Sequence, residues 1–251
     1  HERGWGISGF DWRGQGGSTG PGGTPEGLEA MADDLARFLE EWRTRTPGPH
    51  VLIAHSMGGH VAMRLLARGA STPIDAAVLI APMLAINTAP IPARLAPLIA
   101  RAARRCGFGR RHLWDETGGL TENTPAVAAR QRSLTTSVER FEDMRWWQRR
   151  HPDYVIGAPS WNWIAAAFDG TRALERPGAL EAIRVPMLLL AAPGDRLVSG
   201  AAIERAAHRI PDATLRLFPG SAHEILREAD PVRMAALEAI DAFLDARAPA
   251  R

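Results

Sequence analysis

A serine flanked by small residues is the feature of this 251-residue sequence that points most clearly to chemistry. Ser56 stands in the run IAHSMGG at positions 53–59, after an apolar segment and before a segment with helical spacing. A sharp strand-to-helix turn exposes a serine hydroxyl only where the neighbours two positions away are small, as Ala54 and Gly58 are. Glycine is usual where this chain has Ala54, and we expect the turn to tolerate one extra methyl group. We predict that Ser56 is a nucleophile; the alternative is an incidental serine on a buried turn.

Acyl transfer by a hydroxyl requires a base, a group that orients the base, and donors for the developing oxyanion. Asp195 and His223 each follow a predicted strand, at 185–191 and 214–218. Open α/β sheets place their sites at the carboxyl ends of strands, and the order serine, acid, histidine is expected there. We therefore predict that Asp195 and His223 complete the site, the alternative being simple loop roles. The helix after Ser56 directs N–H groups to the same place, which favours negative charge.

Other acids and histidines compete for these roles. Asp212 precedes its strand and lies at the wrong end of it, and we expect Asp230 to cap the last helix. His208 falls within a helix, while His55 and His60 flank Ser56 and are expected to point away from it. A metal site is the rival use of the histidines, but no His-x-x-x-His pair with a supporting Glu and no cysteine cluster occurs.

Other chemistries find little support in the residues. Cys106 is the single cysteine, and we interpret it as a spare thiol rather than a nucleophile. The glycine-rich stretch 14–23 lacks the Lys-Ser/Thr ending of a phosphate-binding loop. Haloalkane dehalogenation would need a carboxylate in place of Ser56. We expect no cofactor and no metal.

The elements that must position these residues alternate between strand and helix. Short apolar segments predict buried parallel strands, and segments with helical spacing lie between them. The pattern predicts a doubly wound, mainly parallel α/β sheet. The predicted strands are 6–10, 51–54, 76–80, 185–191 and 214–218, and the predicted helices are 26–45 with Thr24 as a cap, 57–68 and 231–246.

The segment 82–177 interrupts this rhythm. It is helical in character, rich in arginine, and holds five of the eight tryptophans: Trp114, Trp146, Trp147, Trp161 and Trp163. We interpret 82–177 as a helical cap insertion over the carboxyl edge of a core formed by 1–81 and 178–251. The tryptophans either hold an acyl chain or belong to the hydrophobic core.

Composition limits the partners. All 30 basic residues are arginine, yet the formal net charge is only +2, so we expect coding bias rather than a nucleic-acid surface. Two arginine clusters are either a solvated face or a surface for anionic lipid headgroups: Arg101, Arg104, Arg105, Arg110 and Arg111, then Arg145, Arg149 and Arg150. One cysteine and no apolar run of about 18 residues suggest a cytoplasmic protein, with peripheral contact at the inner membrane as a further expectation.

Four segments together resemble the α/β-hydrolase superfamily, and more narrowly its lysophospholipase and monoacylglycerol-lipase branch. They are Arg3–Ile7, Asp11–Ser18, His55–Gly59, and His151–Gly157 leading into Pro159 and Trp161. The last segment is similar to that of bacterial lysophospholipase L2-type proteins. The likeness covers nearly the whole chain, and the first three segments carry the narrower match.

The resemblance implies an α/β-hydrolase fold with Ser56 as nucleophile, His223 as base and Asp195 as the orienting acid. It also implies the Met57 N–H as one oxyanion donor and a structural role for the 11–18 loop. The expected substrate is a fatty-acyl monoester, a lysophospholipid or monoacylglycerol, cleaved through an acyl-enzyme. Two alternatives stay open: a general carboxylesterase or thioesterase for small acyl compounds, and a non-catalytic binder on the same fold.

The front of the chain departs from this family. Its members carry three strands and a helix before the segment 6–10, and residues 1–4 resemble the tail of that helix. The loop after the third strand normally supplies the second oxyanion donor, which we expect to lie upstream of residue 1. We therefore expect the sequence to be an N-terminal truncation with the first strands missing.

Overall fold

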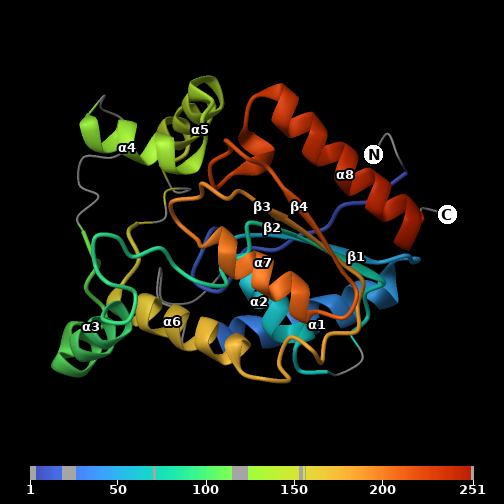
Figure 1. Ribbon diagram of the computed structural model, residues 1–251, viewed down its shortest axis with the longest axis horizontal. Helices are drawn as coiled ribbons and strands as arrows, with labels where there is room; N and C mark the ends of the chain where they lie inside the picture. The colour runs from blue at the N-terminus through green and yellow to red at the C-terminus, as the bar shows by residue number, and fades with distance from the viewer. Residues whose placement is uncertain are drawn as a thin grey trace.

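A four-stranded parallel sheet is the centre of the protein in the computed structural model, which describes residues 4–18, 27–69, 72–114, 124–152, 155 and 157–249 (Figure 1). The strands run in the spatial order β1-β2-β3-β4 and all neighbours are parallel. Their bounds are β1 (Val51–His55), β2 (Ala76–Ile80), β3 (Met187–Ala191) and β4 (Ala213–Leu217). The sheet and its covering helices confirm the predicted α/β architecture.

The two central strands consist wholly of apolar residues, and every one of them is buried. Successive side chains of a strand point to opposite faces. Leu79 of β2 accordingly packs into a core on one face, and its neighbours Val78 and Ile80 into a second core on the other. β1 and β4 are the outer strands of the described sheet, and Ile53 of β1 is 52% exposed. Burial on both faces makes β2 and β3 the rigid part of the sheet.

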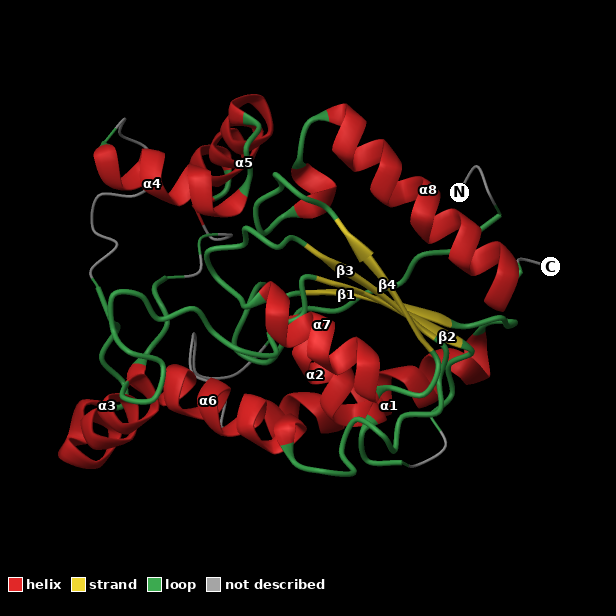
Figure 2. Cartoon of the chain, in the orientation of Figure 1, coloured by secondary structure: helices red, strands yellow, loops and turns green. Residues whose placement is uncertain are grey.

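Helices cover both faces of the sheet (Figures 1 and 2). On one face lie α1 (Leu28–Arg45), α2 (Met57–Leu66), α6 (Trp161–Glu175) and α7 (Gly200–Arg209). On the other lies α8 (Asp230–Arg247), whose Ile240 and Leu244 pack against β2 and β3. An ion pair of Glu29 with Arg64 joins α1 to α2, and Glu29 and Asp33 also pair with Arg68, just after α2.

Further helices of the described residues lie beside the edge at which the strands end (Figure 2). They are α3 (Ala96–Ala103), which continues into a π-helical turn at Arg104–Phe108, α4 (Pro125–Leu134) and α5 (Val138–Arg150). Trp163 of α6 packs against the larger core, whereas Trp114, Trp146 and Trp147 are about half exposed. The tryptophans of this region therefore divide between core and surface.

Two local predictions are wrong. Residues 6–10 form no strand, because none of the described strands pairs with them; Ile7 is 80% exposed and Phe10 packs on Phe38 instead. Asp230 is the first residue of α8 rather than its cap, and its carboxylate accepts a hydrogen bond from Arg140. Several other expectations fall outside the described residues: those on Arg3, Thr24, Glu26, Asp153, Tyr154 and Ile156.

None of the helices in the described ranges is both long and apolar enough to span a bilayer.

Candidate active site

Ser56 occupies the turn between β1 and α2 in a strained backbone conformation. Its φ of 52° and ψ of −116° lie in a region that non-glycine residues rarely adopt. Its N–H donates to the carbonyl of Ile80 at 3.0 Å, and its carbonyl accepts the N–H groups of His60 and Met83, each at 3.0 Å. Three backbone hydrogen bonds therefore hold the turn from β2, from α2 and from the segment after β2.

Small neighbours allow this turn. A Cβ added to Gly59 would lie 2.9 Å from the Cβ of Pro82, which is too close for any residue but glycine. A Cβ added to Gly58 would lie 3.8 Å from the Cβ of Ala54, an ordinary contact. The methyl group of Ala54 therefore fits beside the turn, as expected from the sequence.

A series of short hydrogen bonds joins Ser56, His223 and Asp195. Nε2 of His223 lies 2.8 Å from Oγ of Ser56, and Nδ1 lies 2.6 Å from Oδ2 of Asp195. A carboxylate only accepts, so Nδ1 carries the proton and Nε2 of the neutral ring accepts from the serine hydroxyl. His223 and Asp195 are both buried. The structure thus brings together the three side chains that the sequence singles out.

Asp195 is fixed from its other side. Its Oδ1 accepts the N–H groups of Leu197 at 2.7 Å and Val198 at 3.1 Å. The side-chain amide of Asn87, in the segment after β2, donates to the carbonyls of Asp195 at 2.8 Å and Val198 at 3.0 Å. Sequence reasoning missed Asn87, because no local pattern relates it to a loop 108 residues away.

The competing residues lie elsewhere. Asp212 precedes β4 and forms an ion pair with Arg247 at 2.7 Å, and His208 lies in α7. Nε2–H of His55 donates to the carbonyl of His223 at 3.2 Å, and the two rings are 4.7 Å apart. His55 therefore supports the backbone of His223 and makes no hydrogen bond to Ser56 among the contacts of the described residues.

His60 is wholly buried on α2 and braces the same turn. Nδ1–H donates to the carbonyl of Met83 at 2.8 Å, whereas Nε2 has no hydrogen-bond partner among the described residues. Burial lowers the pKa of His60 to about 4, because a charged imidazolium would lose its hydration there. His60 is accordingly neutral at pH 7 and acts through its one hydrogen bond.

Met57 is the first residue of α2. The N–H groups of a helix's first turn have no acceptor within the helix and carry the positive end of its dipole. They face a site that already holds a serine hydroxyl. The role of the Met57 N–H as an oxyanion donor stays a prediction.

The loop at 11–18 closes on itself. Oδ2 of Asp11 accepts the N–H of Gly17 at 2.9 Å, and the hydroxyl of Ser18 donates to the Asp11 carbonyl at 2.6 Å. Gly16 has a φ of 52°, and a Cβ on it would lie 2.3 Å from Oδ2 of Asp11. These contacts explain the glycines of the motif by the path of the loop.

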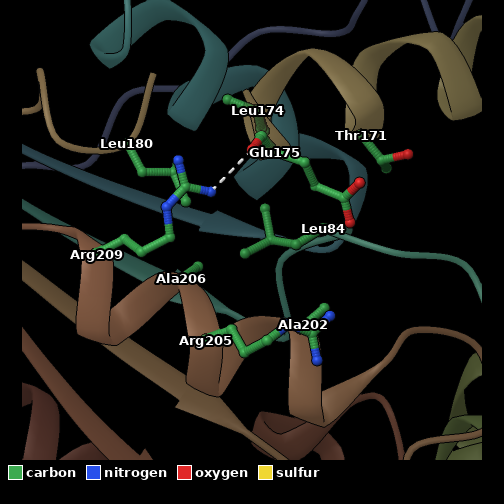
Figure 3. Close-up of a pocket in the computed structure, with 9 residues that line it drawn as sticks. All are labelled: Leu84, Thr171, Leu174, Glu175, Leu180, Ala202, Arg205, Ala206 and Arg209. Atoms are coloured by element: carbon green, nitrogen blue, oxygen red, sulfur yellow. Dashed lines mark hydrogen bonds between the residues drawn. The ribbon is translucent and has the colours of Figure 1, made fainter. Parts of the chain in front are cut away.

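A pocket of about 270 Å³ lies between α6 and α7 (Figure 3). Leu84, Leu174 and Leu180 form much of its wall, and Arg209 donates to the carbonyl of Glu175 at 3.2 Å. None of the three hydrogen-bonded site residues lines it. Across the described residues, no group of three or more His, Cys, Asp or Glu side chains is arranged to hold a metal ion.

Comparison with known proteins gives matches over most of the chain. Residues 1–230 match the family described as serine aminopeptidase, S33. The probable lysophospholipase L2 of Haemophilus influenzae is 26% identical over 250 residues, which cover 98% of this chain and 76% of that protein. Lysophospholipase L2 of Escherichia coli K12 is 28% identical over 225 residues, 85% of this chain and 63% of that protein. The chain thus spans less than two thirds of the E. coli relative.

Solved structures share the architecture. The crystal structure of Paleococcus ferrophilus monoacylglycerol lipase has a TM-score of 0.68 and 21% identity, covering 94% of this chain and 82% of that chain. At this level of identity the likeness concerns the fold.

The buried neutral His60 makes the stability of the fold depend on pH. An unfolded histidine takes up a proton near pH 6.5, whereas folded His60 does so only near pH 4. Between these two pH values the unfolded state therefore binds more protons than the folded state. As the pH falls from about 6.5 to about 4, His60 lowers the free energy of unfolding by up to about 1.4 kcal/mol per pH unit. We expect thermal unfolding of His60→Gln to vary less between pH 7 and pH 4.5 than that of the wild type. His208→Gln, on the exposed side of α7, is the control, and an unchanged pH dependence in His60→Gln would contradict the assignment.

Proposed function

Because this chain belongs to the serine aminopeptidase S33 family and has the α/β-hydrolase fold, we propose that it cleaves fatty-acyl monoesters through an acyl-enzyme on Ser56. Its relatives, the lysophospholipases L2 among them, support its assignment as a carboxylic-ester hydrolase. The observation that carries the proposal is the hydrogen-bonded series from Ser56 through His223 to Asp195.

In the proposed reaction Oγ of Ser56 attacks the ester carbonyl carbon while Nε2 of His223 takes the hydroxyl proton. The tetrahedral intermediate expels the alcohol, which receives this proton from His223, and the acyl group stays on Ser56. A water molecule then gives its proton to His223 and attacks the acyl carbonyl, releasing the fatty acid and restoring Ser56. Asp195 holds the Nδ1–H tautomer and stabilises the imidazolium formed in each step.

The Met57 N–H is the proposed oxyanion donor from this segment. It belongs to the first turn of α2, which begins directly after Ser56. One such donor typically contributes about 10²- to 10³-fold to the rate. The aligned N–H groups of α2 add a favourable field for the same negative charge.

The proposed substrate class is supported by the names of the relatives. Proteins named lysophospholipase L2 and a structural neighbour named monoacylglycerol lipase share the lipid monoester as substrate type. We propose a lysophospholipid or monoacylglycerol as substrate, with 82–177 as a helical cap on a core of 1–81 and 178–251.

We further propose that the start of this cap contacts anionic membrane surfaces. Four exposed apolar side chains lie in α3 and in the turns just before it: Ile91, Leu95, Leu98 and Ile99. Exposed Arg94, Arg104 and Arg105 flank them. Apolar groups beside cations match the interface of an anionic bilayer, where each arginine contributes about 1 kcal/mol.

Loss of the nucleophile tests the chemistry. We expect Ser56→Ala to reduce hydrolysis of p-nitrophenyl esters by about 10⁴-fold or more, because no other group can form the acyl-enzyme. Asp195→Asn keeps the shape of the side chain but favours the wrong tautomer of His223. We expect it to lower kcat about 10⁴-fold. A fluorophosphonate probe should label Ser56 in the wild type. Full activity in Ser56→Ala would show that the triad assignment is wrong, and absence of labelling in the wild type would indicate a binder.

Acyl-chain length tests the lipid proposal. We expect kcat/KM to rise from acetate to medium and long p-nitrophenyl esters, since each buried methylene adds about 0.8 kcal/mol of favourable transfer. Monoacylglycerol and lysophosphatidyl lipids should then be hydrolysed, with release of fatty acid as the measurement. The family description names an aminopeptidase, so an amino-acid p-nitroanilide belongs in the same assay. Preference for acetate, or for the anilide, would count against a lipid substrate.

Sedimentation with vesicles tests the membrane surface. We expect binding to phosphatidylglycerol vesicles and little to phosphatidylcholine, and a loss of about fivefold per charge in Arg104→Gln and Arg105→Gln. Leu98→Gln removes an apolar side chain that is 58% exposed and should also weaken binding. Met234→Gln on α8, 47% exposed on another helix, is the matched control. Equal binding by all variants would refute this surface.

A further inference from the structure

A buried glutamate with no part in the proposed chemistry lies next to the loop that carries His223. Glu228 has no exposed surface and stands between a short 3₁₀ turn at Ile225–Arg227 and α8. A carboxylate is costly to bury unless hydrogen-bond donors surround it. The donors that surround Glu228 therefore indicate what its burial achieves.

These donors come from two segments that are far apart in the sequence. Oε1 accepts the backbone N–H of Ala222 at 2.7 Å, one residue before His223. The backbone N–H of Thr136 lies 3.1 Å from Oε1 and 3.0 Å from Oε2, and the hydroxyl of Thr136 also donates to Oε2. Thr136 belongs to the connection between α4 and α5. One carboxylate thus links this connection to the loop of His223.

The last two residues of α4 also bond directly to the loop of His223. The N–H of His223 donates to the carbonyl of Ser133 at 3.4 Å, and the N–H of Glu224 to that of Leu134 at 2.7 Å. Three consecutive N–H groups are therefore held. Glu228 accepts that of Ala222, and the carbonyls of residues 133–134 accept those of His223 and Glu224. We call residues 133–136 together with Glu228 the base anchor.

We propose that Glu228 is a positioning residue for His223, and that the base anchor makes the place of the base depend on the end of α4 and the α4–α5 connection. The proposal rests on the proposed function, in which His223 is the base. The two hydrogen bonds of its ring, 2.8 Å to Ser56 and 2.6 Å to Asp195, leave little freedom for the backbone behind them. Gly220, with a φ of 81°, lies in this loop, and a glycine leaves the backbone there free to adopt other conformations.

Glu228→Gln in the full chain tests this proposal. Glutamine keeps the shape of the side chain but replaces an acceptor oxygen facing Thr136 or Ala222 with an NH₂ group. We expect kcat for a p-nitrophenyl ester to fall about 10- to 100-fold, since small displacements of a catalytic group cost this much. KM should stay within about twofold, because Glu228 is proposed to act through the loop and not on the substrate. The concentration of active sites is set in each sample by fluorophosphonate titration.

Thr136→Val tests the partner of Glu228 in the same contact, on the α4–α5 connection. It removes only the hydroxyl donor, so we expect a smaller fall in kcat, and the double variant should match Glu228→Gln rather than multiply the two effects. Glu142→Gln removes a partly exposed glutamate of α5 that pairs with Arg145, and should leave kcat unchanged.

Two results would overturn the proposal: an unchanged kcat per active site in Glu228→Gln, or independent effects of the two substitutions. If Glu228→Gln does not fold, an unchanged kcat in Thr136→Val overturns it. Failure of the proposed function is a separate result, in which the wild type neither hydrolyses esters nor reacts with the fluorophosphonate at Ser56.

Discussion

The backbone conformation of Ser56 is the constraint on which the rest of the site depends. A non-glycine residue in such a region costs about 1–3 kcal/mol and persists only where its surroundings over-determine it. Here the Ser56 N–H is tied to β2, its carbonyl to two N–H groups, and Gly59 lets Pro82 approach closely. A relaxed turn would swing the hydroxyl away from Nε2 of His223. The strain is therefore what keeps the proposed nucleophile at the edge of the sheet.

The segment after β2 braces the neighbouring loops on both sides. Met83 in this segment donates its N–H to Ser56 and accepts Nδ1–H of His60, while Asn87 holds the loop of Asp195 through two carbonyls. β2 itself is a central strand with every residue buried, so the segment begins from the most rigid part of the sheet. Parallel strands end at one edge, which explains why residues 56, 195 and 223 meet there.

The sequence predicts those parts of the fold and site that depend on local pattern. The apolar segments predict all four strands within about two residues, and the small residues around Ser56 predict the turn. The strand at 6–10 fails because strand formation depends on a partner that local composition does not reveal. Asn87 and Glu228 could not be predicted for a similar reason. Each forms hydrogen bonds to a loop that folding brings close to it, and no local sequence pattern indicates these contacts. Chain order and strand position restrict the choice of acid and histidine, and the structure places the predicted Asp195 and His223 in hydrogen-bond contact.

The candidate site joins two differently supported parts of the molecule. Ser56 is held by backbone hydrogen bonds to β2, to α2 and to Met83 in the segment after β2. His223 is buried as well, but the N–H groups of its loop are held by the end of α4 and by Glu228, which also binds the α4–α5 connection. The carbonyl of His223 accepts Nε2–H of His55. A shift of that connection would therefore displace the base relative to the nucleophile while leaving the strained turn intact. The 2.8 Å contact between Oγ of Ser56 and Nε2 of His223 is the point at which such a shift would act first.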